Sequence, residues 1–184
     1  MTDSPKRLVL LSGPLAVGKT TLRERLVSEH GFEYVRSSRF LMEMARRENL
    51  LIDRRSLQEL GDRLDRETDY RWIVDDVAKP SMDALPSQDR WLVDAVRKAR
   101  QVEHFRRMAP ATVRHVHLTA PEVVLRDRYE KRRLEGNDKD SAPYDEAIAH
   151  DNERAARSLI EVADLVLDMS EMTVGEAIDL IVSH

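Results

Sequence analysis

The chain contains no cysteine, which excludes disulfide bonds and metal sites built on thiolates. Its six glycines and seven prolines form no low-complexity tract, and we find no internal repeat. Basic residues do not outnumber acidic ones: 30 against 34 give a net charge of −4, so a nucleic-acid partner is not expected. The start, MTDSPKRLVLLSG, lacks a long apolar run, so we expect no signal peptide, no membrane span and a cytoplasmic protein.

The remaining composition is typical of a globular protein with a heavily charged surface. Hydrophobic residues make up 41% of the chain and charged residues 35%. A length of 184 residues is enough to bury a full core in one domain. We therefore predict a single domain over residues 1–184.

A phosphate-binding loop is the strongest motif in the sequence. SGPLAVGKTT contains G-x-x-x-x-G-K-[ST], in which glycines let the backbone approach an anion and the following helix turns its positive end toward it. Lys19 would reach the β- and γ-phosphates of ATP, and the hydroxyl of Thr20 would bind Mg²⁺. The predicted ATP-binding residues are Gly13, Pro14, Leu15, Ala16, Val17, Gly18, Lys19, Thr20 and Thr21.

The surroundings of this motif match what the loop requires. Residues 7–11, RLVLL, form a short apolar run suited to a buried strand. Residues 19–30 have helical periodicity through Leu22 and Leu26, and Gly31 supplies a helix stop. Strand, loop and helix thus occur in the required order, which favours a ligand site over a Gly-rich turn without one.

Further apolar runs alternate with helical patterns along the chain. Strands are predicted at 8–12, 32–36, 91–96, 112–119 and 164–169. Helices are predicted at 119–133 and at 173–184, the latter with a capping box from Thr173 to Glu176. Alternating strands and helices predict an α/β fold, with a parallel sheet covered on both faces and ligands at the carboxyl ends of its strands.

Two stretches exceed a minimal crossover between strands. Residues 37–89 contain three predicted helices, the second with a capping box from Ser56 to Glu59. Residues 134–163 contain a polar loop, LEGNDKDSAP, followed by one predicted helix over 144–163. Both excursions lie beside the predicted strand ends.

The chain resembles the P-loop nucleoside and nucleotide kinases, which include adenylate kinase, the deoxynucleotide kinases and dephospho-CoA kinase with its relatives. The likeness covers nearly the whole chain and rests on the phosphate loop, on WLVDAVRKARQVEHFR, on LRDRYEKRR and on VADLVLDMS. It implies a P-loop NTPase fold with a five-stranded parallel sheet in the order 2-3-1-4-5. It also implies an acceptor-binding helical insertion over 37–89 and a lid-like segment over 126–150. Three departures are Ala95, where glycine is usual, Gln101, where relatives carry glutamate, and the segment 38–42, SRFLM, where relatives often carry Gly-Asp-x-x-Arg. The usual acceptor-binding arginine is thus missing after the second strand, and Arg39 is the candidate to replace it.

The other candidate site residues are acidic and basic groups near strand or helix ends. Asp94 could orient Mg²⁺ through water or accept a proton from the acceptor, and its alternatives are a helix N-cap or an ion pair with Arg97. Arg97 and Arg39 are predicted to hold an acceptor phosphate. Arg128 and Arg132, four residues apart on one helix, match the lid arginines of the family, and their alternative is a solvated helix end.

Two histidines have a different expected role. His115 and His117 alternate along the run 112–119, so both side chains should point to one face of the sheet. No metal-ligand spacing with acidic residues accompanies them, and a structural role is favoured over zinc binding.

The residues together predict a kinase that transfers the γ-phosphoryl of ATP, with Mg²⁺, to a nucleoside monophosphate or similar phosphorylated acceptor. Two alternatives stay open: a regulatory ATP-binding module or ATPase, and a kinase for an unphosphorylated nucleoside or sugar-like acceptor. The expected partner is a small nucleotide-like molecule, with no membrane partner. A monomer and a homodimer are both compatible with the sequence.

Overall fold

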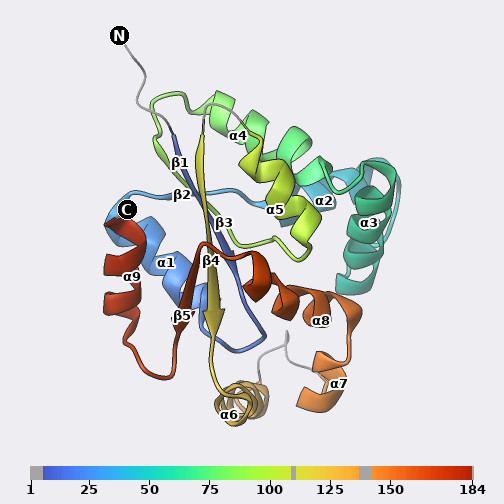
Figure 1. Ribbon diagram of the computed structural model, residues 1–184. Coiled ribbons are helices and arrows are strands. Elements are labelled where there is room, and N and C mark those ends of the chain that lie inside the picture. Colours follow the sequence, from blue (N-terminus) through green and yellow to red (C-terminus); the bar gives the residue numbers. More distant parts are fainter. Residues whose placement is uncertain (1–5, 109–110, 137–141, 184) are drawn as a thin grey trace.

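The computed structural model describes residues 6–108, 111–136 and 142–183, and a five-stranded parallel sheet lies at its centre (Figure 1). The strand order β2-β3-β1-β4-β5 confirms the predicted fold. Strands β2 and β3 are shorter than predicted: β2 ends at Tyr34, ahead of α2, which begins at Ser37, and β3 ends at Val93. The strands are β1 (Arg7–Ser12), β2 (Glu33–Tyr34), β3 (Arg90–Val93), β4 (Thr112–Thr119) and β5 (Leu165–Asp168).

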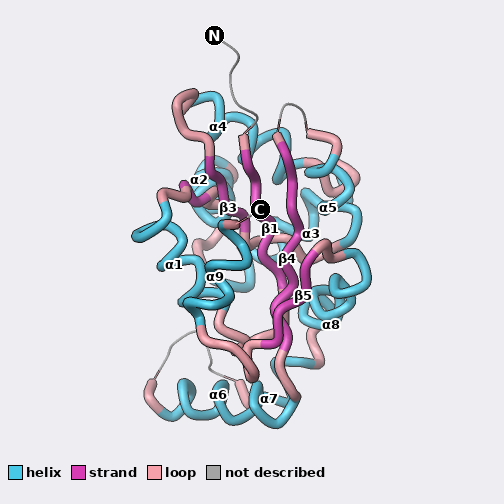
Figure 2. The backbone as a smooth tube through the Cα atoms, turned by 60° about the vertical axis from the view of Figure 1, so that its left-hand side comes forward, coloured by secondary structure: helices cyan, strands magenta, loops and turns pink. Residues whose placement is uncertain are grey.

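Helices cover both faces of this sheet. The helical elements are α1 (Lys19–His30), α2 (Ser37–Arg47), α3 (Arg54–Glu67), the π-helix η1 (Ile73–Ala78), α4 (Lys79–Ala84), α5 (Ala99–Arg106), α6 (Glu122–Leu134), α7 (Tyr144–Ile148), α8 (Asp151–Ser158), the 3-10 helix η2 (Leu159–Val162) and α9 (Val174–Val182). Helices α1 and α9 lie on one face, and α2 to α5 lie on the other (Figures 1 and 2). In the described part of the chain, no helix is long and apolar enough to cross a membrane.

The two-residue period of β1 explains how one strand serves two cores. Leu8 and Leu10 belong to the hydrophobic cluster under α2 to α5, whereas Val9 and Leu11 belong to the cluster under α1 and α9. All four side chains are at most 5% exposed. Successive side chains of a strand point to opposite faces, so a continuous apolar run is what a strand covered on both sides requires.

Three local predictions are corrected by the structure. Helix α3 begins at Arg54 with Asp53 as its N-cap, whose carboxylate accepts from the Ser56 N–H, so the Ser56–Glu59 capping box is wrong. The predicted helix over 144–163 is divided into α7, α8 and η2, because His150 has extended backbone and caps α8. The third helix of the 37–89 excursion is a π-helix followed by α4. The Thr173–Glu176 capping box is confirmed.

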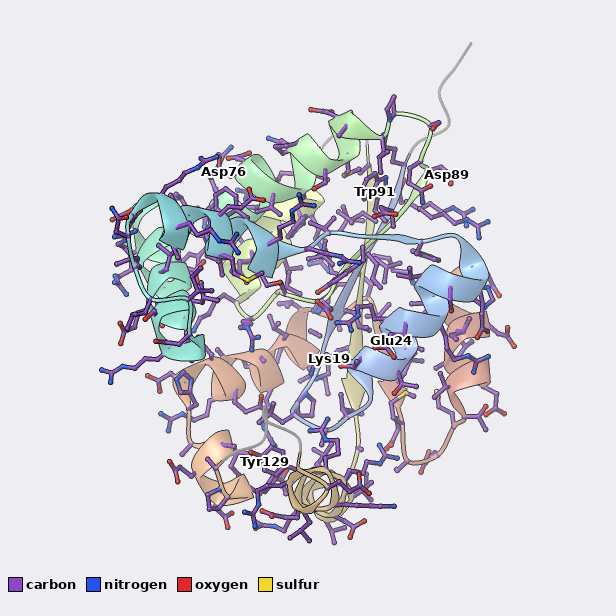
Figure 3. The ribbon with its side chains drawn as sticks, turned by 180° about the vertical axis from the view of Figure 1, so that it is seen from behind. Lys19, Glu24, Asp76, Asp89, Trp91 and Tyr129 are labelled. Atoms are coloured by element: carbon purple, nitrogen blue, oxygen red, sulfur yellow. The ribbon has the colours of Figure 1, made fainter. Side chains whose placement is uncertain are left out.

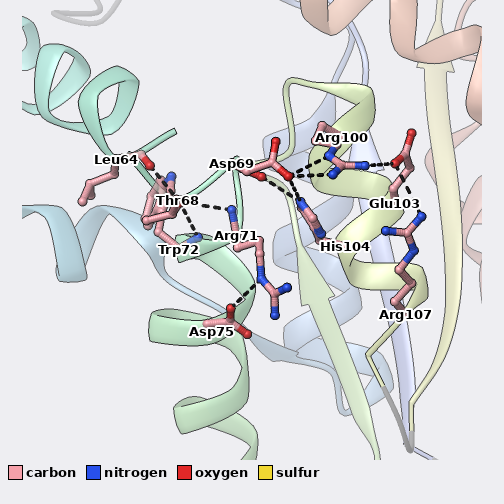
Figure 4. A network of polar contacts seen from close by, with 10 residues as sticks. All are labelled: Leu64, Thr68, Asp69, Arg71, Trp72, Asp75, Arg100, Glu103, His104 and Arg107. Carbon is pink, nitrogen blue, oxygen red and sulfur yellow. Dashed lines mark hydrogen bonds and ion pairs between the residues drawn. The ribbon is translucent and has the colours of Figure 1, made fainter. Parts of the chain in front are cut away.

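Polar contacts fasten the 37–89 excursion to α5 (Figure 4). The Asp69 carboxylate accepts from Arg100 Nε at 3.0 Å and from Nη2 at 2.6 Å, and His104 Nε2 lies 2.7 Å from the Asp69 carbonyl oxygen. Deeper in the joint, Asp65 accepts from Gln101 Nε2, in α5, at 3.2 Å, and from the indole N–H of Trp72, within the excursion, at 2.7 Å. Exposed ion pairs contribute little free energy, so the contact with the buried Gln101 is the stronger part of this joint.

Candidate nucleotide-binding site

The loop between β1 and α1 requires glycine at both ends. Gly13 has a φ of 141°, and a Cβ there would lie 2.4 Å from the carbonyl oxygen of Leu118 in the neighbouring strand β4. Gly18, the N-cap of α1, has a φ of 107°, which also favours glycine. Between them, Ala16 is held in the left-handed region at a φ of 62°. The loop is therefore a tight, partly strained turn packed against the sheet.

The amino end of α1 is open to an anion. No side chain caps this helix, and the first N–H groups of any α-helix lack intrahelical acceptors. The helix dipole adds partial positive charge at the same place. Thr20 and Thr21 are both exposed in this first turn. Backbone donors and hydroxyl groups thus meet where the sequence predicts the phosphates and Mg²⁺.

Lys19 folds back over the loop in this structure. Its ammonium group donates to the carbonyl oxygens of Gly13 and Pro14, the latter at 2.7 Å. Figure 3 shows Lys19 where the loop enters α1, on the side of the molecule where α6 and Tyr129 lie. Burial lowers the pKa of Lys19 to about 8, because the charged ammonium loses water there.

Four side chains from three other segments, the loop after β3, α6 and α8, act electrostatically on Lys19. Glu153 and Asp94 raise its pKa, whereas Arg97 and Arg132 lower it, and all four effects are smaller than that of burial. Asp94, Arg97 and Arg132 were predicted for the site, and Glu153 was not. The tertiary structure therefore surrounds the loop lysine with charges of both signs from distant parts of the chain.

Asp94 follows β3 directly and is held by two partners. Its Oδ2 accepts from Arg23 at 2.9 Å and its Oδ1 accepts from the Tyr34 hydroxyl at 2.6 Å, which leaves the Asp94 side chain 13% exposed. The guanidinium of Arg23 also lies over the Tyr34 ring, 4.9 Å from its centroid. Burial and the Asp94 charge raise the pKa of Tyr34 above its usual range. The ion-pair partner of Asp94 is thus Arg23 rather than Arg97, and Asp94 does not cap a helix.

The two predicted acceptor-binding arginines are exposed and lie on different elements. Arg97 precedes α5, where its backbone N–H donates to Gln101 Oε1 at 2.8 Å. Gln101 Oε1 also accepts from the Lys98 N–H at 3.2 Å, so the unusual glutamine positions the backbone beside Arg97. Arg39 is 78% exposed and pairs with Glu43 on its own helix at 3.1 Å. The convergence of Arg39 and Arg97 on one phosphate stays a prediction.

The two predicted lid arginines have different surroundings. Arg128 donates to the carbonyl oxygen of Met169, just after β5, at 3.0 Å. Arg132 lies over the Tyr129 ring, 5.9 Å from its centroid, and its charge acts on Lys19. Of this pair, Arg132 is therefore the one associated with the phosphate loop. Within the lid-like segment 126–150, residues 137–141 lie outside the described residues.

A buried hydrogen-bond chain holds the start of the loop. Ser12 Oγ lies 2.7 Å from His115 Nε2 and 2.8 Å from His117 Nδ1, and the three residues are at most 2% exposed. His115 Nδ1 faces the Val162 carbonyl oxygen at 3.2 Å, which can only accept, so His115 Nε2 accepts from Ser12 and Ser12 accepts from His117. Burial lowers the pKa of His117 to about 4, so the chain is neutral near pH 7.

This arrangement confirms that the two histidines share a face of the sheet, and it gives them a structural role. Ser12 is the last residue of β1 and stands beside His117 in the register of β1 and β4. Over residues 6–108, 111–136 and 142–183, no group of three histidine or acidic side chains is suited to hold a metal ion.

Comparison with known families identifies the family to which this chain belongs. The family model described as AAA domain, AAA_18, matches residues 9–158. The chain belongs to the AAA_18 family. The matched range runs from β1 to the last residue of α8 and includes every predicted site residue. Membership confirms the resemblance to P-loop kinases that the motifs predicted. No curated protein of similar sequence was found.

Solved structures share the fold of this AAA_18 protein at low sequence identity. A protein from Chloroflexus aurantiacus J-10-fl with a provisional kinase assignment is 17% identical, with a TM-score of 0.59 over 98% of this chain and 99% of its own. TT1252 from Thermus thermophilus is 16% identical, with a TM-score of 0.62 over 98% of each chain. A gluconokinase from Sinorhizobium meliloti 1021 is 15% identical over 97% of this chain and 90% of its own, with a TM-score of 0.46, too low to bear on activity.

Sequence reasoning missed three side chains at the site of this AAA_18 protein. Arg23 and Tyr34 hold Asp94, and Glu153 accepts from the Leu15 N–H at 2.8 Å. Arg23 lies one helical turn after Lys19, which is a weak signal because many helix positions share that spacing. Glu153 forms an i,i+4 pair with Arg157, a pattern that is also common on exposed helices. Only the fold distinguishes these residues from ordinary surface pairs.

Proposed function

We propose that this protein is an ATP-dependent kinase that transfers the γ-phosphoryl group of ATP to a nucleoside monophosphate or similar phosphorylated small molecule. One observation carries the proposal: the loop with Lys19 at the open end of α1 is surrounded by Arg97, Arg132 and Asp94. Phosphoryl transfer requires alignment and compensation of negative charge rather than covalent participation of the protein. Lys19, Arg97 and Arg132 carry the positive charge that would compensate the negative charge of the transferred phosphoryl group.

The loop and α1 would hold the nucleotide. Backbone N–H groups of Gly13–Thr21 would bind the β- and γ-phosphates, and Lys19 would leave the carbonyl oxygens of Gly13 and Pro14 to reach them. Arg132 would face the same phosphates from α6, with Arg128 one helical turn earlier on that helix. A lysine of lowered pKa gains more from an anionic ligand than a fully hydrated lysine does.

Thr20 and Asp94 are the residues that would hold Mg²⁺, which supplies charge neutralisation on the phosphate oxygens when bound. Oxygen donors suit this hard cation, and Thr20 is exposed beside the loop. Because Arg23 and Tyr34 occupy the two oxygens of Asp94, we assign Asp94 to an indirect, water-mediated contact. Asp94 would also orient the acceptor at the end of β3.

The acceptor would enter from the side of the 37–89 excursion. Arg97 would bind its phosphate through two parallel hydrogen bonds, with Arg39 swinging from Glu43 to assist. Gln101 accepts from the Arg97 N–H and donates to Asp65 in α3. It would therefore hold the Arg97 loop and α3 in fixed relative positions. Closure of this excursion and of residues 142–150, in the lid-like segment, would exclude water from the transferred group.

ADP release from MgATP, with and without a panel of acceptors, tests the proposal. Release that depends on a nucleoside monophosphate supports it, acceptor-independent hydrolysis supports an ATPase module, and release that depends on a nucleoside or sugar supports an unphosphorylated acceptor. Lys19→Ala should lower turnover about a hundredfold or more. Lys131→Ala, on the exposed side of α6, is the matched control and should retain activity.

Two further variants assign the acceptor side. Arg97→Lys should raise the KM of the acceptor and leave that of ATP nearly unchanged, since lysine lacks the planar fork of arginine. Asp94→Asn should mainly depress kcat. If Arg97→Lys weakened ATP and spared the acceptor, Arg97 would belong with Arg132 on the nucleotide side.

A further inference from the structure

A buried carboxylate occupies one of the backbone donors of the phosphate loop. Glu153 in α8 is 6% exposed, and its Oε1 accepts from the N–H of Leu15 at 2.8 Å. Leu15 lies inside the loop, between Gly13 and Gly18. Among the charged groups that act on Lys19, Glu153 has the largest effect. A protein anion therefore lies where loop donors and the loop lysine are arranged to receive an anion.

The carboxylate is held in place by a cation on its own helix. Arg157 donates from Nε to Glu153 Oε1 at 3.2 Å, and its Nη1 and Nη2 bind Glu122 at 2.7 Å and the Tyr144 hydroxyl at 3.1 Å. Buried charges are costly unless they are paired and hydrogen-bonded, and Glu153 meets both conditions in this arrangement. The contact with Leu15 is thus a built feature rather than a loose surface encounter.

The same carboxylate is unfavourable once nucleotide phosphates arrive. ATP brings several negative charges to the donors around Lys19, and like charges in a partly desolvated site repel strongly. The Leu15 N–H is also a single donor and serves one strong acceptor at a time. Phosphates and Glu153 therefore compete for the same positive region of the loop.

We propose that Glu153 is a tethered competitor of the nucleotide, which stabilises the empty phosphate loop and is displaced when the phosphates bind. The proposal rests on ATP binding at this loop, as proposed above, and makes Glu153 a determinant of nucleotide affinity. Displaced from Leu15, the carboxylate keeps Arg157 as its partner one helical turn away. The phosphate loop thus exchanges a protein anion for a nucleotide anion.

Calorimetric titration with MgADP tests the proposal directly. Glu153→Gln keeps the size and a neutral acceptor but removes the charge, so it should bind MgADP about tenfold more tightly than the parent, since charged hydrogen bonds are stronger than neutral ones. Glu161→Gln removes the same charge from an exposed position on η2 and should leave the Kd unchanged. An unchanged or weaker Kd in Glu153→Gln overturns the proposal.

Thermal unfolding distinguishes competition from a purely structural role. Without nucleotide, Glu153→Gln should have a lower Tm than the parent, because the empty loop loses its charged acceptor. At saturating MgADP the gap should narrow, because the contact with Leu15 is then absent from the parent as well and only the charged pair with Arg157 is still lost. An equal loss of Tm with and without MgADP, together with an unchanged Kd, would mean that Glu153 only packs α8 against the loop.

The outcomes separate this proposal from the proposed function. Failure of the parent and of both variants to bind MgADP overturns both. Binding by the parent with the same Kd in Glu153→Gln overturns only the competition. If Glu153→Gln does not fold, Glu153→Asp tests the proposal instead. Aspartate keeps the pair with Arg157 but is one methylene too short to reach the Leu15 N–H, so this variant should also bind MgADP more tightly than the parent. Binding no tighter than that of the parent refutes the proposal.

Discussion

Replacing Lys19 by methionine should change how the stability of the protein depends on pH. The ammonium group of Lys19 lies within the loop, and burial lowers its pKa from 10.5 to about 8. A fall of this size makes the charged form about 3 kcal/mol less favourable in the folded protein than in the unfolded chain. Methionine has a similar length and no charge, so it removes this penalty.

The pH window follows from the two pKa values. Below about pH 8 the lysine is charged in both states and the full penalty applies. Between about 8 and 10.5 the folded protein releases the proton while the unfolded chain keeps it, so the parent gains stability as the pH rises. The gain is about 1.4 kcal/mol per pH unit, because the unfolded state binds one more proton.

Methionine also has a cost, since the carbonyl oxygens of Gly13 and Pro14 each lose a donor. At about 1 kcal/mol per hydrogen bond, this loss offsets most of the penalty removed at neutral pH. The net effect at one pH is therefore small, whereas the pH dependence isolates the charge. The loss of the two hydrogen bonds lowers the free energy of unfolding of Lys19→Met by the same amount at every pH, so it does not change how this free energy depends on pH.

Urea unfolding at several pH values from about 7 to 10.5, without phosphate or nucleotide, measures the effect by linear extrapolation. The free energy of unfolding of the parent minus that of Lys19→Met should rise by about 3 kcal/mol across this range. Lys131→Met, on the exposed side of α6, controls for the loss of one lysine from the net charge. A difference that is flat or falls with pH would refute the assigned burial of Lys19.

Three substitutions test the loop and its support by urea unfolding at pH 7. Gly13→Ala should lower the free energy of unfolding by about 2–4 kcal/mol, because the added Cβ would lie 2.4 Å from the Leu118 carbonyl oxygen and the residue would be strained at positive φ. A loss below about 1 kcal/mol would contradict this packing. Ala16→Gly should instead raise it by up to about 1 kcal/mol by relieving the φ of 62°, and a loss would argue against that strain. Tyr34→Phe keeps the ring under Arg23 but removes the 2.6 Å hydrogen bond to Asp94, so it should cost about 1–2 kcal/mol; an unchanged stability would place the hydroxyl outside the network.

The sheet and the phosphate loop could be predicted because their signals are local. The run RLVLL needs no distant partner to indicate a strand buried on both faces, and Leu8 to Leu11 do alternate between two cores. The spacing of Gly13, Gly18 and Lys19 expresses a backbone geometry that adjacent residues determine. The strand order was implied by family resemblance rather than by the residues, and the structure confirms it.

Helix boundaries depend on competition between neighbours, which patterns resolve less well. Ser56 and Glu59 have the spacing of a capping box, but Asp53 lies earlier and its carboxylate accepts from the same region of backbone. Likewise, a continuous helical pattern over 144–163 gave no indication that His150 would leave helical geometry and cap α8. In both cases a side chain at a position where no helix start was predicted accepts from one of the first N–H groups of the helix.

The electrostatic surroundings of the site were decided by tertiary structure alone. Glu153 and Leu15 are 138 positions apart, and Arg23 and Asp94 are 71 positions apart, so no local pattern connects either pair. Each of these charges had several plausible partners along the chain, and solvent exposure was the default for all of them. Packing α8 against the loop and α1 beside β3 removed water from these groups, and a carboxylate without water must find a donor. The sequence by itself thus determined where the phosphate-loop motif lies, and the fold decided which side chains contact its backbone donors and its lysine.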